Sequence, residues 1–266
     1  MPAIHPSAVV DPQATIAGDV TIGPLCIVGP HVTIGPGCKL VGQCYITGHT
    51  TLGANNTVFP GVCIGAPPQD TAWNESITSY VRIGDNNILR EHVTIHSGSK
   101  ENGETRIGNN CFLMNYVHIA HDCKVGNRVI MVPYAGASGY VELMDGCFIS
   151  GLTGIHQFCR VGRFAMISGQ SAIAKDLPPF MIADGRHGDI RGVNIVALRR
   201  NNFSLESIRV IKDIYQAFYR SDLNLTNSLN KIKTELPQTP EVLEFLDFVQ
   251  ASKRGVIHGY SLGRRS

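Results

Sequence analysis

An apolar, mostly aliphatic side chain recurs at every sixth position through most of the first 173 residues of this chain. The series runs from position 4 to position 64, resumes from 83 to 95, and continues from 107 to 173, with Ala137 as its smallest member. A period of six matches neither an α-helix nor a simple alternating strand. It is typical of a parallel β-helix, in which each six-residue unit forms one side of a three-sided coil and coils stack about 4.8 Å apart.

Two other positions of the six-residue unit are also restricted. The fourth residue after the aliphatic one is small, and seven of the eight cysteines occupy it: Cys26, Cys38, Cys44, Cys111, Cys123, Cys147 and Cys159. This shared position favours cysteine as a small apolar filler over a disulfide or metal framework, and no C-x-x-C pair is present. Glycine often follows the aliphatic residue directly, as at Gly35 and Gly108, which we interpret as the sign of tight bends between short strands.

The period divides the chain into two predicted domains. Residues 1–180 are expected to form the mainly β repeat domain, and residues 181–266 a C-terminal α-helical domain that covers its open end. Two polar segments, 66–82 and 96–106, interrupt the repeat and are predicted to be loops outside the coil, where binding groups often lie. The period itself does not fix the handedness, for which the general crossover rule favours right-handed winding.

Helical spacing begins after Ser204, a suitable N-cap. Apolar residues then recur at Leu205, Ile208, Ile211, Tyr215 and Phe218, and similar spacing returns over 225–232 and 242–249. These segments are predicted to be helices of the C-terminal domain.

The composition excludes several classes of function. With 23 basic and 21 acidic residues the formal net charge is +2, so we expect no nucleic-acid partner. No apolar run approaches the roughly 20 residues that span a bilayer, so we do not expect an integral membrane protein. The first six residues lack the charged and apolar regions of a secretory signal, and we therefore expect a cytoplasmic location.

Three-sided winding places residues eighteen positions apart on the same face of neighbouring coils. His121, Gly139 and Gln157 then form a column with neighbours about 5 Å apart, and Asp122 lies beside His121. A histidine next to a carboxylate is typical of a general base with its orienting group, since an imidazole with the usual pKa of about 6.5 can accept a proton at pH 7. The backbone N–H of Gly139, which has no side chain, could stabilise an oxyanion.

Two other interpretations of this column stay open. Ten histidines on a polar solenoid can become neighbours by chance. A zinc site is the other possibility, because His118 and His121 supply two ligands, but no third histidine falls at a matching position and catalytic zinc usually has three protein ligands. We therefore expect no metal.

Four stretches, 112–126, 154–158, 176–179 and 192–200, resemble the bacterial UDP-N-acetylglucosamine O-acyltransferases, which perform the first step of lipid A synthesis. The sequence His-Ile-Ala-His-Asp within the repeats, followed by Ile-His-Gln-Phe, carries the resemblance, which extends over nearly the whole chain. It implies a left-handed β-helix and a homotrimer with active sites between subunits. It also implies transfer of a 3-hydroxyacyl chain from acyl carrier protein to the C3 position of UDP-N-acetylglucosamine, with no cofactor except the phosphopantetheine that arrives on the carrier.

The resemblance also implies roles for individual residues. His121 would be the general base, Asp122 would orient it, and Gly139 would offer its N–H to the oxyanion. Gly169 matches a position that limits the length of the acyl chain, and its missing side chain should admit a longer chain. The expected contacts of the UDP-sugar are Asp70, His118, His156, Gln157, Asn194 and Arg200, of which His118 could instead contact the donor. The expected contacts of the acidic carrier protein are Arg209, Lys212 and Arg220.

The chain departs from the pattern of this family at four positions. Ala72 stands where a lysine is usual, Tyr140 replaces a histidine, Asn201 replaces the second arginine of a pair, and Val196 occupies an often acidic position. Because these changes concern recognition rather than the base, the sequence supports acyl transfer more strongly than it supports the identity of the sugar, which could be another UDP-sugar such as a C3-amino sugar. Three further alternatives remain open: an acetyl-coenzyme A donor, a zinc-binding solenoid and a non-catalytic scaffold.

Overall fold

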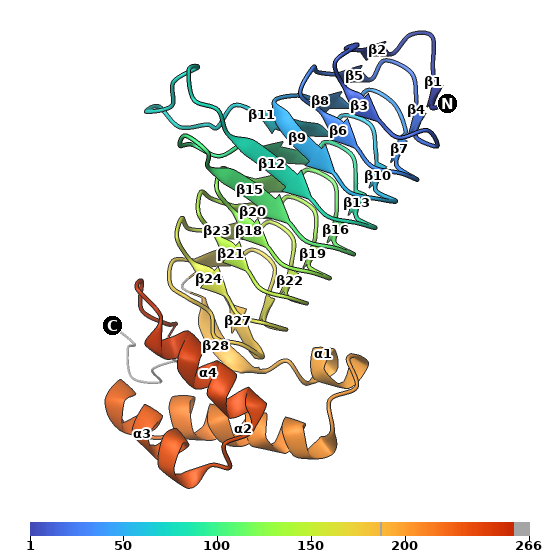
Figure 1. Ribbon diagram of the computed structural model, residues 1–266. Helices are drawn as coiled ribbons and strands as arrows, with labels where there is room; N and C mark the ends of the chain where they lie inside the picture. The colour runs from blue at the N-terminus through green and yellow to red at the C-terminus, as the bar shows by residue number, and fades with distance from the viewer. Residues whose placement is uncertain (187, 258–266) are drawn as a thin grey trace.

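The computed structural model describes residues 1–186 and 188–257, which form a left-handed parallel β-helix followed by four helices (Figure 1). The prediction of a β-helix with a C-terminal helical region is confirmed. Each turn of the solenoid contributes one short strand to each of three sheets, and strands of successive turns pair in parallel with residues eighteen apart opposite one another, as Ile4 and Ile22 are.

The three sheets share this construction. Sheet A contains β1 (Ala3–Ile4), β4 (Thr21–Ile22), β7 (Lys39–Leu40), β10 (Thr57–Val58), β13 (Ile88–Leu89), β16 (Phe112–Leu113), β19 (Ile130–Met131), β22 (Phe148–Ile149), β25 (Met166–Ile167), β27 (Met181–Asp184) and β28 (Asp189–Val193). Sheet B contains β2 (Val9–Val10), β5 (Ile27–Val28), β8 (Tyr45–Ile46), β11 (Cys63–Ala66), β14 (Thr94–His96), β17 (His118–Ile119), β20 (Gly136–Ala137), β23 (Gly154–Ile155) and β26 (Ala172–Ile173). Sheet C contains β3 (Thr15–Ile16), β6 (Thr33–Ile34), β9 (His49–Leu52), β12 (Tyr80–Ile83), β15 (Glu104–Ile107), β18 (Lys124–Val125), β21 (Glu142–Leu143) and β24 (Arg160–Val161). The pair β27–β28 is antiparallel.

The corners of the prism lie three residues after the buried aliphatic residue. Leu25, Tyr116 and Tyr140 are examples, with φ of 57°, 60° and 61°, and most corner residues are not glycine. A single residue in the left-handed region costs about 1–2 kcal/mol. The stacked ladders on both sides of each corner offset this cost. The left-handed winding departs from the right-handed crossover rule, because that rule reflects the packing of a helical crossover and these turns contain only short strands and corners.

The glycines that directly follow the aliphatic residues do not make the bends, so that interpretation is wrong. Except for Gly65, whose φ is 80°, none of them has a positive φ. A Cβ at Gly35 would lie 2.7 Å from the carbonyl of Gly53, and one at Gly108 would lie 2.7 Å from the carbonyl oxygen of Gly126. Glycine is therefore required at these positions by the close approach of the next turn.

The interpretation of the cysteines as apolar fillers is confirmed. All eight are free thiols, and the seven at the repeated position are buried. Burial raises the pKa of the Cys123 thiol to about 12, which keeps it protonated and unreactive at neutral pH.

Two irregular loops leave the solenoid. In sheet C, Leu52 pairs with Ile83 and Ile83 pairs with Ile107, so the turns between them are longer than eighteen residues. The extra residues form the loops 67–79 and 97–103, which project from the same side of the prism (Figure 1). The Asn102 N–H donates to the Thr78 carbonyl at 2.8 Å, which joins one loop to the other.

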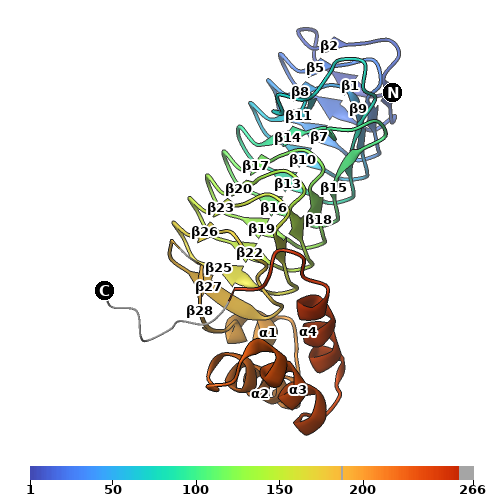
Figure 2. The same ribbon diagram turned by 90° about the vertical axis from the view of Figure 1, so that its left-hand side faces the viewer.

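The C-terminal region contains α1 (Ile195–Arg200), α2 (Leu205–Tyr219), α3 (Leu225–Glu235) and α4 (Pro240–Gln250) below the last turns of the solenoid (Figure 2). Ser204 caps α2, as predicted, by accepting a hydrogen bond from the Ser207 N–H at 3.0 Å. Leu205 does not belong to the buried face: it is the first residue of the helix and is 84% exposed. In the described ranges, no helix combines the length and apolar character needed to cross a bilayer.

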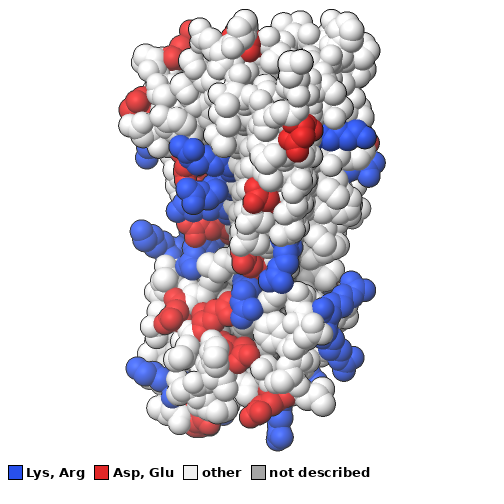
Figure 3. All heavy atoms as spheres, turned by 45° about the vertical axis from the view of Figure 1, so that its right-hand side comes forward, with Lys and Arg blue, Asp and Glu red and all other residues white. Residues whose placement is uncertain are grey.

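Charged side chains pair along sheet C. Arg82 and Arg106 both contact Glu104, and further along the solenoid Lys124 and Arg160 both contact Glu142. Figure 3 shows basic and acidic side chains side by side along the solenoid below its N-terminal turns. Each carboxylate is shared by two basic side chains, so the pairing offsets only part of the positive charge on the outer face of sheet C.

Asp176 holds the end of the solenoid to the C-terminal segment. Its carboxylate is fully buried and accepts hydrogen bonds from the Arg160 N–H and the Ser252 hydroxyl, both at 2.8 Å. The Asp176 carbonyl also accepts a hydrogen bond from the Ile257 N–H at 2.8 Å, and the Asp176 N–H donates to the Gly255 carbonyl at 3.0 Å. The segment after α4 therefore returns to the last turn and closes it.

We predict that Asp176→Ala lowers the free energy of unfolding by about 3–5 kcal/mol, because it removes a buried carboxylate that accepts two hydrogen bonds and lies 3.9 Å from the Arg160 guanidinium. Urea denaturation at one fixed protein concentration measures the change. Asp184→Ala is the matched control, since its ion pair with Arg191 is exposed and such pairs contribute about 0–1 kcal/mol. Equal midpoints for the two variants would contradict the role assigned to Asp176.

Candidate active site

The stacked register of sheet B brings the predicted column together. His118 pairs with Gly136 and Gly136 with Gly154, so the residues after β17, β20 and β23 occupy equivalent positions in three successive turns. The register continues around the corner, where the Tyr140 N–H donates to the His121 carbonyl at 3.1 Å. His121 and Gly139 are therefore neighbours along the solenoid, as the eighteen-residue register predicts.

His121 and Asp122 form a hydrogen-bonded pair. The His121 Nδ1 lies 2.9 Å from Asp122 Oδ2, and the two side chains are only 13% and 9% exposed. An ionised carboxylate can only accept, so Nδ1 carries the proton and the Nε2 lone pair is free. The backbone of Asp122 is fixed too, because its N–H donates to Thr105 Oγ1 at 2.9 Å. The pair therefore has the tautomer that a general base requires.

Sequence reasoning missed Ser99, which contacts this pair from the loop 97–103. Its N–H and its hydroxyl both donate to Asp122 Oδ2, at 2.9 and 2.7 Å, and its hydroxyl lies 3.0 Å from the Tyr140 hydroxyl. The repeat register sets the position of residues within the coil but not of residues in an inserted loop. No signal in the sequence could have placed Ser99 beside Asp122.

Gly139 lies directly against the imidazole of His121. A Cβ on Gly139 would be 2.6 Å from His121 Nε2, so only glycine fits beneath the ring. Within the described part of the chain, the Gly139 N–H has no acceptor. The equivalent position holds proline in other turns, at Pro24, Pro36 and Pro133, because the solenoid does not use this donor. The donor therefore remains available to a ligand.

His118 faces out of sheet B, and its ring lies edge-on to that of His96. Sequence reasoning predicted His118 but missed His96. Thr94 Oγ1 lies 2.8 Å from His118 Nδ1, and His96 Nδ1 lies 2.7 Å from the Pro67 carbonyl. Desolvation, with smaller contributions from His96 and His121, lowers the pKa of His118 to about 4, so its ring is neutral at pH 7. Across the ranges that the structure describes, no group of three or more His, Cys, Asp or Glu side chains is arranged to hold a metal ion.

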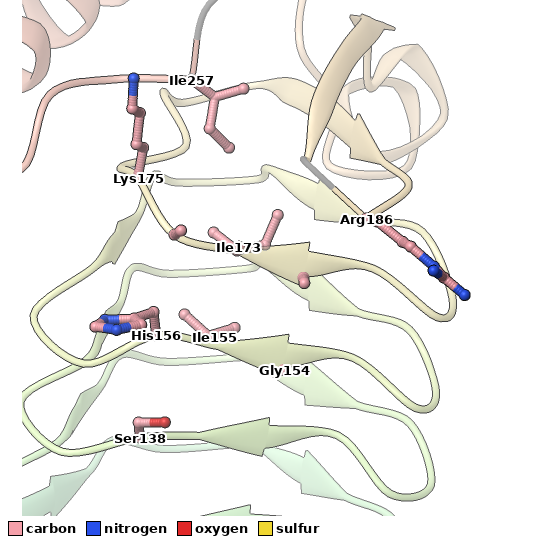
Figure 4. A pocket seen from close by; sticks show the side chains of 10 residues that line it. Ser138, Gly154, Ile155, His156, Ile173, Lys175, Arg186 and Ile257 are labelled. Atoms are coloured by element: carbon pink, nitrogen blue, oxygen red, sulfur yellow. The ribbon is translucent and has the colours of Figure 1, made fainter.

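His156 and Gln157 lie one turn beyond Gly139, and both are exposed. His156 lines a cavity of about 620 Å³ on the outer face of sheet B, with Ser138 and Gly154. Figure 4 shows Lys175 and Arg186 on opposite sides of this cavity. Gly154 of β23 and Ala172 of β26 line this cavity, and their small size leaves room for it.

Asn194 and Arg200 lie elsewhere in the same chain. They line a cavity of about 540 Å³ between α1 and sheet A, and the departures Val196 and Asn201 line the same cavity. Asn194 is buried and caps α1 by accepting from the Ala197 N–H at 3.2 Å. Asp122 lines a different cavity of about 590 Å³. A single chain therefore does not bring Asn194 and Arg200 to His121.

The remaining predicted residues are also dispersed. Asp70 lies on the loop 67–79, where its Oδ1 accepts from the Ala72 N–H at 2.9 Å. Gly169 lines a separate cavity with Tyr134 and Leu152 near the edge of sheet A. The three predicted carrier contacts are exposed on or after α2: Arg209, Lys212 and Arg220.

Comparisons with known proteins agree over both parts of the chain. A family model described as UDP N-acetylglucosamine O-acyltransferase, domain 2, matches residues 176–257, and a bacterial transferase hexapeptide model matches residues 2–36 and 104–137. A protein of Thermodesulfovibrio yellowstonii named acyl-[acyl-carrier-protein]–UDP-N-acetylglucosamine O-acyltransferase is 46% identical over 96% of this chain and 99% of its own. The UDP-N-acetylglucosamine acyltransferase structure from Francisella novicida has a TM-score of 0.93 and 37% identity, and covers 96% of this chain and 94% of that one. The Bacteroides fragilis enzyme has a TM-score of 0.92 and 39% identity over 96% of this chain and all of its own.

We predict that Gly139→Ala displaces the His121 ring, because the new methyl group would overlap it. The fold should persist, since the overlapping atoms belong to a side chain. A crystal structure of the variant should show the Nδ1–Oδ2 bond broken, and any reaction that uses His121 as its base should slow by roughly 10²-fold or more.

Gly136→Ala is the matched control, because a Cβ there meets no atom within 4 Å. Retention of the His121–Asp122 bond in Gly139→Ala would show that the ring does not need the bare backbone.

Proposed function

Because this chain belongs to the UDP-N-acetylglucosamine O-acyltransferase family, we propose that His121 is the general base of its acyl transfer. The chain is an acyl-carrier-protein-dependent acyltransferase that acts on UDP-N-acetylglucosamine in the first step of lipid A synthesis. The free Nε2 of His121, beside a bare backbone N–H, is the observation that supports its role most directly.

The proposed reaction joins a 3-hydroxyacyl thioester to the C3 hydroxyl of the sugar. His121 Nε2 takes the hydroxyl proton while the sugar oxygen attacks the thioester carbonyl. Asp122 stabilises the imidazolium, and the Gly139 N–H donates to the oxyanion of the tetrahedral intermediate. The carbon–sulfur bond then breaks, and the imidazolium returns its proton to the thiolate of the carrier's phosphopantetheine arm.

The neutral state of His118 suits a binding role better than a second acid. With its pKa lowered to about 4, it cannot supply a proton at neutral pH, but its ring can donate or accept a hydrogen bond. We propose that His118 binds the acyl donor or the sugar nucleotide, and that the exposed His156 and Gln157 bind the UDP-sugar.

The separation of the predicted contacts supports a homotrimer with active sites between subunits. Asn194 and Arg200 line a cavity on another face of the chain from Asp122, so both groups can hold one substrate only if neighbouring chains supply them. In this arrangement Asp70 also contacts the UDP-sugar, and Arg209, Lys212 and Arg220 receive the acidic carrier protein. We propose that residues 1–180 build the catalytic solenoid and that the predicted domain 181–266 begins with β27 and β28, which extend sheet A, and continues with the four helices; its residues 258–266 lie outside the described residues.

The cysteines support a cytoplasmic location. Eight free thiols, seven of them buried, suit a reducing compartment, where disulfides are rare.

We predict that His121→Ala lowers kcat by roughly 10²–10⁴-fold, the usual contribution of a positioned base. Steady-state turnover with UDP-N-acetylglucosamine and 3-hydroxyacyl carrier protein measures this, with His5→Ala as a control histidine on the first turn. Turnover of His121→Ala near that of the control would refute the assignment.

We also predict that Gly169→Met shifts the preference toward shorter acyl chains. A Cβ at Gly169 makes only an ordinary contact, 3.4 Å from the Gly151 carbonyl, so the side chain can extend into the neighbouring cavity. Because each buried methylene contributes about 0.8 kcal/mol, loss of room for two should lower kcat/KM for the longest substrate by roughly tenfold.

Competition between carrier proteins of different acyl lengths, with products identified by mass spectrometry, measures this preference. Gly18→Met is the control, since a Cβ at Gly18 meets no atom within 4 Å and Gly18 does not line the cavity beside Gly169. An unchanged product distribution in Gly169→Met would show that this position does not limit the length of the acyl chain.

A further inference from the structure

A continuous line of hydrogen bonds runs from Tyr140 to His121. The Tyr140 hydroxyl lies 3.0 Å from Ser99 Oγ, which lies 2.7 Å from Asp122 Oδ2, and that oxygen lies 2.9 Å from His121 Nδ1. The four residues come from the turn after β17, the turn after β20 and the loop 97–103. The line ends at His121 Nδ1, whereas Nε2, on the other side of the ring, is the nitrogen that would take the proton.

The chemistry of the groups fixes the direction of each bond. Asp122 can only accept, so the Ser99 hydroxyl donates its proton to Oδ2. Ser99 Oγ must then accept from Tyr140, which makes the phenol the outer donor. Three donors converge on the same carboxylate oxygen, namely the Ser99 hydroxyl, the Ser99 N–H and the His121 Nδ1–H.

The carboxylate depends on these donors because water has little access to it. Ser99 is 8% exposed and the Asp122 side chain 9%. A buried carboxylate loses its hydration, and hydrogen bonds from the protein must replace it. If one donor is removed, the carboxylate can rotate away from His121.

The loop that carries Ser99 is fixed at several points. The Tyr80 N–H donates to the Gly103 carbonyl at 2.9 Å, and the Gly103 N–H donates to the Lys100 carbonyl at 2.8 Å. Lys100 Nζ lies 5.5 Å from the centre of the Tyr140 ring, and Tyr140 stacks on Phe158 with ring centres 4.8 Å apart. Loop and phenol therefore support each other around Ser99.

We propose that Ser99 and Tyr140 are positioning residues that hold Asp122, and through it His121, in the reactive geometry. This inference rests on the proposed role of His121 as the base. It gives Tyr140, which stands where the family usually has a histidine, a role in rate that does not require contact with the sugar.

Steady-state kinetics of four variants test the inference: Ser99→Ala, Ser99→Thr, Tyr140→Phe and the double variant Ser99→Ala/Tyr140→Phe. Tyr140→Phe keeps the ring that meets the His121 ring edge-on, with centres 5.4 Å apart, and removes only the hydroxyl. Tyr116→Phe is the matched control, because Tyr116 occupies the same corner position of its six-residue unit, stacked on Tyr134.

We expect Ser99→Ala to lower kcat by roughly ten- to a hundredfold, since it removes a bond to a charged group, and Tyr140→Phe to lower it roughly fivefold. KM for both substrates should change by less than about twofold, because neither hydroxyl binds them. Ser99→Thr, which keeps the hydroxyl, should restore most of the rate. The double variant should be no slower than Ser99→Ala, because Tyr140 acts only through Ser99.

Three outcomes would overturn the inference. The first is a kcat of Ser99→Ala and of Tyr140→Phe equal to that of Tyr116→Phe. The second is a rise in KM with no fall in kcat. The third is a fall in kcat of the double variant equal to the product of the two separate falls. His121→Ala, assayed alongside, distinguishes failure of the positioning inference from failure of the proposed role of His121 as the base. If His121→Ala is inactive and the Ser99 and Tyr140 variants are normal, only the positioning inference fails. If His121→Ala is active, the proposed base fails as well.

Discussion

The hydrogen-bonded register between successive turns determines where the functional groups of the solenoid repeats lie. Strands of neighbouring turns pair at residues eighteen apart, so one position of the six-residue unit repeats down each face. The same stacking buries the aliphatic residues, excludes a side chain at Gly35, and places the His121 ring on the bare backbone of Gly139. Core packing and catalytic geometry therefore have one physical cause.

The same register explains what could be predicted from the sequence. The period of six was enough to place His121 beside Gly139, because within the coil sequence distance translates directly into position. It could not place Ser99, since an inserted loop is free of the register. It also could not reveal why glycine follows the aliphatic residues, because a bend and a close approach both favour glycine and only φ distinguishes them. Handedness came from the family resemblance alone.

The residues proposed to bind the UDP-sugar and the residues proposed to activate it lie in different parts of the chain. The groups that would activate the nucleophile, His121 and Asp122, gather at the corner between sheets B and C. Asn194 and Arg200 line a cavity against sheet A, together with the departures Val196 and Asn201. Under the proposed assignment, the residues that differ from the family pattern in that cavity would alter the binding of the UDP-sugar without disturbing His121. An active site shared between copies would make this separation functional, because each copy would contribute a different face.

Each corner of the coil is a single residue whose neighbours lie in the turns before and after it, and the coil itself places no residue on its outer side. The loop 97–103 supplies the missing neighbour at the corner of Asp122, where Ser99 donates two hydrogen bonds to the carboxylate. Tyr140, one turn further along, supports that serine from the solenoid side. The regular coil thus sets the spacing of the proposed catalytic groups along its axis, whereas the irregular insertion contributes hydrogen bonds that orient them. The proposed mechanism needs both, since a base that is correctly spaced but free to rotate would lose most of its advantage over water.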